Sequence, residues 1–205
     1  MGNRRPPEIS MFGAAGGIGI SNTVTVTTTR TPVEGNFLFV CFGTSTTTTV
    51  VTPPSGWTEV TADPGGGGTN LMFYKVAGAS EPTSFSWVLS AVTGGGSWTI
   101  LENSRVDPTP VYTEEIANDG VSRTTHTFTT YNIAEPSVAF AAIALGSAVG
   151  AGSITINNNF TRINAGGNYE SAYRDYNSED PSQVTSFSTS SRTASRRIVV
   201  FKAAY

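Results

Sequence analysis

Residues 53–101 limit the fold of this chain more than any other stretch. They contain every tryptophan of the sequence, Trp57, Trp87 and Trp98, and two glycine runs at 65–68 and 94–96. Between the glycine and proline turns lie short segments rich in aromatic and β-branched residues, as expected for strands. One begins at Trp57, and the others span 71–76, 84–89 and 97–101. This pattern predicts the middle of an all-β sandwich.

Two near-continuous apolar runs lie outside that stretch, at 36–43 (NFLFVCFG) and 137–146 (SVAFAAIALG). Strands that are apolar along their whole length are covered on both faces. Each run therefore predicts a central strand, one in each of two sheets. Residues 22–29 (NTVTVTTT) alternate instead, and predict a half-buried strand.

The remaining chain supplies more strands and turns, giving roughly twelve strands in all. Prolines in 102–120 predict a long loop that crosses between sheets. The aromatic spacing in 168–176 fits a helix as well as a strand. Three asparagines at 157–159 predict a hairpin turn, because asparagine tolerates positive φ.

These segments together predict an antiparallel two-sheet β-sandwich of the jelly-roll or Greek-key type. No internal repeat or linker is visible after residue 20, so residues 21–205 are expected to form a single domain. Residues 1–20 lack a regular period and predict an irregular N-terminal arm. We expect this arm to dock on the chain's own sandwich or on a neighbouring subunit; the alternative is a frayed terminus. Its candidate contacts are Arg4, Arg5, Ile9, Met11, Phe12 and Ile18.

Composition narrows the class of protein. Charged residues make up 13% of the chain, against about 25% in typical domains, and threonine and glycine are abundant. This favours an extracellular or virion β-protein. A net charge of −3 argues against binding nucleic acid. No apolar run reaches about 18 residues, so no membrane helix is expected. Pro6, Pro7 and Glu8 interrupt the N-terminal segment and argue against a signal peptide.

The residues that most often carry chemistry are sparse. His126 is the only histidine and Cys41 the only cysteine, which argues against a zinc site and a disulfide. His126 lies in a threonine-rich segment without a nucleophile motif, so a structural histidine is expected, and Cys41 reads as a buried hydrophobe. The carboxylates Glu114, Glu115, Asp175, Glu179 and Asp180 read as solvated loop residues, with a calcium loop at 175–180 as the alternative. The sequence therefore predicts no enzymatic activity and no cofactor.

Two clusters are candidates for binding. Tyr169, Tyr173 and Tyr176 lie beside asparagines and could form a stacking platform for a glycan; packing in the core or an interface is the alternative. Three late arginines, at 192, 196 and 197, are expected to contact an acidic neighbouring subunit rather than nucleic acid.

Several local motifs recur in a familiar order. They are Gly35-Asn36-Phe37-Leu38-Phe39-Val40, Pro53-Pro54-Ser55-Gly56-Trp57-Thr58, Phe73-Tyr74-Lys75-Val76-Ala77, Glu81-Pro82-Thr83-Ser84-Phe85-Ser86-Trp87 and a closing Ile198-Val199-Val200-Phe201. Over residues 22–203 the chain is similar to β-sandwich domains in structural proteins of tailed bacteriophages and in some bacterial surface proteins. The resemblance is densest from 35 to 101. It implies a capsid decoration, a head or neck fibre, or part of a tail tip, and it brings no catalytic residues.

The expected function is therefore that of a non-enzymatic phage virion structural protein. We expect a capsid decoration or a head- or neck-attached protein on the particle surface, docked through its N-terminal arm. Its expected partners are other virion proteins and further copies of itself, with no nucleic acid and no membrane. The alternative is a carbohydrate-binding receptor-recognition module of a tail fibre or a cell-surface protein.

Overall fold

The computed structural model describes residues 12–44, 50–60, 69–93, 95–117, 119–145, 154–166, 169–176 and 178–204. Within these ranges the regular structure is entirely β-strand. Every strand pair described is antiparallel. The predicted all-β antiparallel sandwich is confirmed. Among these residues no helix is long and apolar enough to span a membrane.

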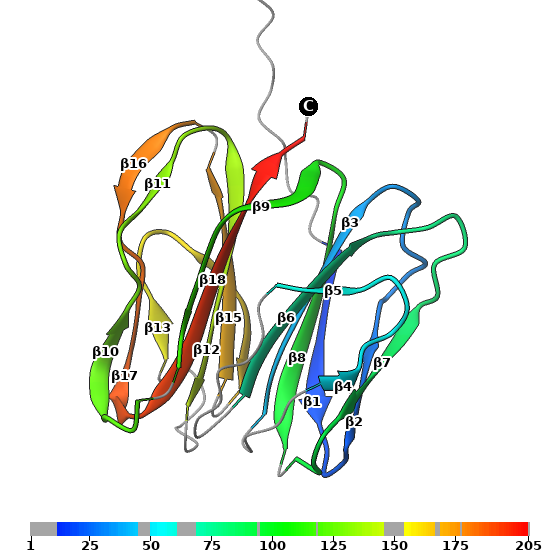
Figure 1. Cartoon of the computed structure of the whole chain (residues 1–205), viewed down its shortest axis with the longest axis horizontal. Helices are drawn as coiled ribbons and strands as arrows, with labels where there is room; N and C mark the ends of the chain where they lie inside the picture. The colour runs from blue at the N-terminus through cyan, green and yellow to red at the C-terminus, as the bar shows by residue number, and fades with distance from the viewer. Residues whose placement is uncertain are drawn as a thin grey trace, which may run out of the picture.

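Two five-stranded sheets pack face to face at the centre of the molecule (Figure 1). The first has the order β1 (Phe12–Ile18), β8 (Gly96–Asn103), β3 (Phe37–Thr44), β6 (Thr69–Val76) and β5 (Thr58–Glu59). The second has the order β9 (Val106–Ile116), β18 (Ala194–Ala203), β12 (Ser137–Leu145), β15 (Tyr169–Tyr176) and β14 (Thr161–Gly166).

Smaller sheets cover the outer faces of this pair. On one side lies the sheet of β2 (Thr23–Thr27), β7 (Ser84–Leu89) and β4 (Val50–Thr52). On the other side lie the sheet of β10 (Arg123–Thr127), β17 (Ser186–Arg192) and β13 (Thr155–Ile156), and the ribbon of β11 (Tyr131–Ile133) and β16 (Asp180–Gln183). Three hydrophobic clusters fill the spaces between these four layers. The chain is therefore two sandwiches joined back to back.

The two apolar runs become the middle strands of the two central sheets, as predicted. In β3, Phe37, Phe39 and Cys41 face the central cluster, while the residues between them face the outer cluster of the first half. In β12, Val138 and Phe140 face the central cluster and Ala139 faces the other way. Both strands are buried throughout. Burial on both faces explains why neither sequence alternates.

The two halves repeat one topology, which the sequence analysis did not predict. The order β1-β8-β3-β6-β5 in the first half corresponds strand for strand to β9-β18-β12-β15-β14 in the second. The outer order β2-β7-β4 likewise corresponds to β10-β17-β13. In the first half the pairs β1–β8, β2–β7 and β3–β6 are those of a long hairpin wrapped into a jelly roll. In the second half the pairs β9–β18, β10–β17 and β12–β15 correspond to them, and the ribbon β11–β16 is an addition. The expected single sandwich is thus a pair of like sandwiches.

A seam of aromatic rings joins the halves where β3 faces β12. The rings of Phe39 and Phe140 stack with centroids 4.0 Å apart and an interplanar angle of 15°. Each lies on the middle strand of its five-stranded sheet. Phe37 and Phe201 add an edge contact at 4.8 Å. This central cluster is buried in the manner of a domain core, so the halves are expected to unfold together.

Two segments differ from the sequence-based prediction. Residues 12–18, expected to be irregular, form β1 and pair with β8 along their whole length. Sheet pairing uses backbone groups, so it needs no side-chain period, and glycine lets the Trp98 ring lie against Gly16. Residues 106–116, expected as loop, form the long edge strand β9, where Pro108 and Pro110 are tolerated. The ambiguous segment 169–176 is a strand.

Candidate functional sites

The predicted docking arm is divided by the structure. Arg4, Arg5, Ile9 and Met11 lie outside the described residues, and Phe12 begins β1. Ile18 ends β1 and belongs to the hydrophobic cluster of the first half. It therefore packs on the chain's own sandwich, which is one of the two docking surfaces expected for the arm.

The three tyrosines do not form an exposed platform. Tyr169 is fully buried and contributes to the central cluster, while Tyr173 packs against the edge of that cluster. Tyr176 is buried in the outer cluster of the second half, where its hydroxyl lies 3.0 Å from that of Tyr131. Side chains alternate along β15, so residues 169 and 173 share one face and residue 176 occupies the other. These positions pack the core.

Tyr169 fills the space that Gly43 leaves open. A Cβ at Gly43 would lie 2.0 Å from the ring of Tyr169. Burial raises the pKa of the Tyr169 hydroxyl well above its usual range, and raises that of the Cys41 thiol to about 11. Neither group ionises near neutral pH, so Cys41 is a buried hydrophobe, as predicted.

The candidate carboxylates and arginines form structural ion pairs. Glu115 lies on β9 and accepts a hydrogen bond from Nε of Arg197 at 2.8 Å. Arg197 is 2% exposed and points between the central sheets. The prediction of solvated loop carboxylates is wrong for Glu115, and a rim position is wrong for Arg197. Arg174 of β15 donates a hydrogen bond to Asp180 of β16, in the outer ribbon, at 2.9 Å.

His126 is buried on the inner face of β10 opposite Phe187. Burial lowers its pKa, and the charges of Arg196 and Arg123 lower it further. A neutral imidazole packed in a core agrees with a structural histidine. In the described part of the chain no three His, Cys, Asp or Glu side chains lie close enough to hold a metal ion.

A small cavity lies at the end of the central seam near the carboxyl terminus of β18. Asp175, Asn103 and Ser137 contribute its polar wall, and its volume is about 10 Å³. That space holds about one water molecule. Burial raises the pKa of Asp175 to about 6. The cavity is too small for an organic ligand.

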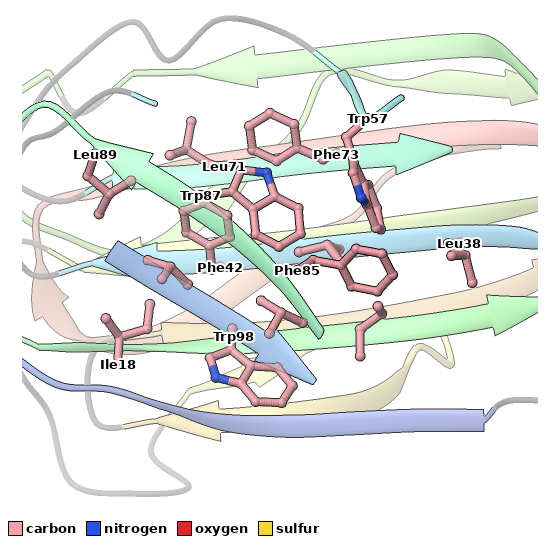
Figure 2. Close-up of a cluster of buried hydrophobic side chains, with 14 of the residues drawn as sticks. Ile18, Leu38, Phe42, Trp57, Leu71, Phe73, Phe85, Trp87, Leu89 and Trp98 are labelled. Carbon is pink, nitrogen blue, oxygen red and sulfur yellow. The ribbon is translucent and has the colours of Figure 1, made fainter. Parts of the chain in front are cut away.

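The larger hollow is a groove between the edge strands β1 and β2, with a volume of about 210 Å³. Its walls are Gly17, Ile18 and Gly19 at the end of β1, Thr23, Val24 and Thr25 of β2, and Trp98 of β8. Trp57 and Trp87 pack together at 5.1 Å, whereas Trp98 lies apart from them beside β1 (Figure 2). Sequence reasoning missed this hollow because it assigned the glycines to the arm, whereas its assignment of Trp98 to the core agrees with the structure.

Hydrogen bonds fix the corner that closes this groove. Thr93 donates its N–H to the carbonyl of Ser21 at 2.9 Å and its hydroxyl to the carbonyl of Gly19 at 3.2 Å. The N–H of Leu89 donates to the carbonyl of Asn22 at 2.7 Å. The turn between β1 and β2 is thereby tied to the connection between β7 and β8, so the groove has a rigid rim.

Comparison of the chain with protein-family models gives no match, and comparison with curated proteins gives none either.

Proposed function

We propose that this protein is a non-enzymatic structural component of a bacteriophage particle, attached as a capsid decoration or at the head or neck. The observation that carries the proposal is the pair of jelly-roll-type sandwiches fused through the Phe39–Phe140 seam. Such a block presents its two- and three-stranded outer sheets to neighbours. Jelly-roll sandwiches occur in viral capsid proteins and in lectins, which is an argument from fold analogy.

The motifs behind the phage resemblance are the ones that build the first sandwich. The GNFLFV motif leads into β3, and the FYKVA motif completes β6. The SFSW motif forms β7, whose Trp87 is fully buried in the cluster of that half. These residues build the strands and core of the first sandwich. They support the likeness to the phage domains, but the function must depend on residues at the surface.

Several groups that an enzyme could use are buried or form ion pairs within the fold. His126 is packed in a core, Glu115 pairs with Arg197, and Asp180 pairs with Arg174. Ion pairs of this kind hold strands in place instead of polarising a substrate. Their arrangement supports a structural role.

The docking role is assigned to the segment before β1. Arg4 and Arg5, followed by Ile9 and Met11, give it a basic and an apolar part. Phe12, also a predicted arm contact, is the first residue of β1 and joins the arm to the sandwich. Neighbouring virion subunits, further copies of this chain included, are the proposed partners.

Deletion of residues 2–11 tests the proposal, because it removes the arm and keeps β1. The truncated chain should fold with an unchanged melting temperature and fail to enter particles assembled in its presence. Its matched control is the full chain carrying Arg4→Lys and Arg5→Lys, which keeps the charge and should be incorporated. Normal incorporation of the truncated chain would refute docking through the arm.

The alternative function, carbohydrate recognition, no longer rests on the tyrosines. Tyr169 and Tyr176 are buried.

A further inference from the structure

A sheet edge exposes unpaired peptide groups, and proteins usually block such edges against pairing with another chain. Several edge strands of this protein are blocked by their own residues. β9 contains two prolines, and β10 and β14 each contain an arginine. The ladders of these three strands also shift in register. The edge strands β4, β5 and β13 are only two or three residues long.

The edge strand β2 has none of these protections. Its sequence is Thr-Val-Thr-Val-Thr, and it pairs with β7 in one continuous register. Val24 and Val26 are buried inside the sandwich, whereas Thr25 and Thr27 are exposed. β10, the corresponding strand of the second half, is interrupted by a bulge. The shared fold therefore does not require the open edge of β2.

One other edge strand, β1, is also regular and free of charge and proline. It is rich in glycine, however, and offers few side chains for pairs with a second strand. β1 lies beside β2 in the adjoining layer, where its small residues project little beyond the backbone. β2 is therefore the better template for pairing with another chain.

Hydrogen bonds at the two ends of the β2–β7 ladder show which peptide groups face the free edge. The N–H of Leu89 donates to the carbonyl of Asn22 at 2.7 Å. The N–H of Thr28 donates to the carbonyl of Thr83 at 2.8 Å. Residues 22 and 28 therefore direct their peptide groups toward β7. Successive residues of a strand direct these groups to opposite sides, so residues 23, 25 and 27 direct theirs away from β7.

Most of these edge groups are unpaired within the described part of the chain. The N–H of Thr23 donates to the hydroxyl of Ser21 at 2.9 Å. The N–H groups of Thr25 and Thr27 point to the free edge, where no described strand adjoins β2. The carbonyls of the three threonines point the same way. A strand laid along this edge meets both donors and acceptors.

The sequence of β2 is the same when it is read in either direction. Two copies that meet antiparallel about a two-fold axis at Thr25 therefore match residue by residue. Threonines lie opposite threonines, and valines lie opposite valines. Such threonine pairs and β-branched pairs stabilise neighbouring strands, and no charge lies opposite another.

We propose that two copies of this chain associate through their β2 strands, antiparallel about a two-fold axis at Thr25. The N–H and the carbonyl of Thr25 bond to those of Thr25 in the other copy, and the N–H of Thr27 bonds to the carbonyl of Thr23. The two outer sheets then continue into one. Because the corresponding edge at β10 is blocked, the contact closes as a dimer and does not extend into a fibre. The inference does not depend on the proposed virion role.

A strand donated by the arm of another copy is the competing occupant of this edge. The arm contains Pro6 and Pro7, which have no N–H to donate and interrupt pairing. A second β2 strand, in contrast, offers a donor and an acceptor wherever the first needs them. The second copy therefore fits this edge better than the arm.

Thr25→Pro is the main test variant, because the N–H of Thr25 points to the free edge. Proline there removes a donor that the dimer uses and no hydrogen bond of the β2–β7 ladder. Its matched control is Thr25→Val, which keeps the N–H and a β-branched side chain. A second variant, Thr25→Lys, places like charges opposite each other at the axis. Thr125→Lys, on β10, is its control.

The test is sedimentation velocity of the purified full chain at concentrations from about 1 µM to 1 mM. Interfaces smaller than about 1,200 Å² are usually weak, so we expect a dimer whose Kd lies in this range. Thr25→Pro and Thr25→Lys should each raise that Kd by about tenfold or more, because the two-fold axis repeats each change in both copies. Thr25→Val and Thr125→Lys should leave it unchanged. Melting temperatures close to that of the wild type show that the variants are folded.

Three results would overturn the inference. The first is a wild type that stays monomeric over the whole range. The second is dimerisation of Thr25→Pro and Thr25→Lys with the Kd of the wild type. The third is loss of the dimer on deletion of residues 2–11, which would make the arm the pairing strand. Particle incorporation does not enter this assay, so its outcome is separate from that of the arm-docking test.

Discussion

Replacing Phe39 or Phe140 of the central seam by alanine should destabilise both halves at once. Phe39 and Phe140 are 1% and 2% exposed, and their rings stack at 4.0 Å. Replacing a buried phenylalanine by alanine costs about 3–5 kcal/mol, out of a total stability of about 5–15 kcal/mol. The stacking itself contributes about 0.5–1.5 kcal/mol of that loss. Once one ring is gone, removing the other should therefore cost less by about that amount.

The positions of the tryptophans make the assay specific to each half. Trp57, Trp87 and Trp98 all lie in the first half, so tryptophan fluorescence reports on that half alone. Far-ultraviolet circular dichroism reports on the strands of both. In guanidinium chloride the wild type should give coincident transitions. Phe140→Ala, made in the second half, should lower the fluorescence midpoint as far as the dichroism midpoint.

A double-mutant cycle then measures the coupling across the seam. Phe39→Ala and Phe140→Ala together should fall short of additivity by about 0.5–1.5 kcal/mol. The control pair is Phe39→Ala with Phe128→Ala, because Phe128 lies in the outer cluster of the second half and should add without coupling. An unmoved fluorescence transition in Phe140→Ala would refute the reasoning, since it would mean that the halves fold independently.

Three further changes probe single features of the fold. Gly16→Ala puts a Cβ 2.5 Å from the Trp98 ring, and should lower the free energy of unfolding by about 1–3 kcal/mol, measured by chemical denaturation. Burial raises the pKa of Asp175 to about 6, above the value of about 3.9 in the unfolded chain. The stability of the wild type should therefore fall as pH rises through 6. Asp175→Asn should flatten that part of the pH profile of the melting temperature. Arg197→Met leaves Glu115 without its buried partner and should lower the free energy of unfolding by about 3 kcal/mol. Adding Glu115→Gln to the same chain should restore part of that loss, measured in the same denaturation assay.

Local patterns in the sequence were enough to predict the strands that alternate or are apolar throughout. The runs at 36–43 and 137–146 correctly predicted β3 and β12, because burial on both faces removes polar residues from a strand. The positive φ at the asparagine turn was also predicted correctly: Asn158 and Asn159 adopt φ of 58° and 55°. The hairpin expected around this turn was wrong, because β13 pairs with β17 and β14 pairs with β15 in a different sheet. Propensity and burial act on the residues themselves, so the sequence carries their signal.

Edge strands were harder to predict, because their pairing depends on the backbone. β1 is glycine-rich and β9 contains two prolines, and each has a partner on one side only. Such strands are held by neighbours distant in the chain, and a period of side chains is not required. The sequence therefore suggested an arm in the first case and a loop in the second.

The duplication of the fold left a faint trace in the sequence. Thr-Ser-Phe-Ser occurs at 83–86 and again at 185–188, and in each case it leads into the strand that pairs with the second strand of its half. Elsewhere the halves have diverged, since Trp98 corresponds to Arg196 and a core position tolerates many apolar residues.

Electron cryo-microscopy of purified phage particles tests the proposed function most directly. The account predicts density for the paired sandwiches on the particle surface, with the segment before β1 running into a neighbouring subunit. Mass spectrometry of the same particles should detect the chain in a fixed ratio to the capsid protein. Absence of the chain from particles, in a preparation that retains the other virion proteins, would contradict the proposal.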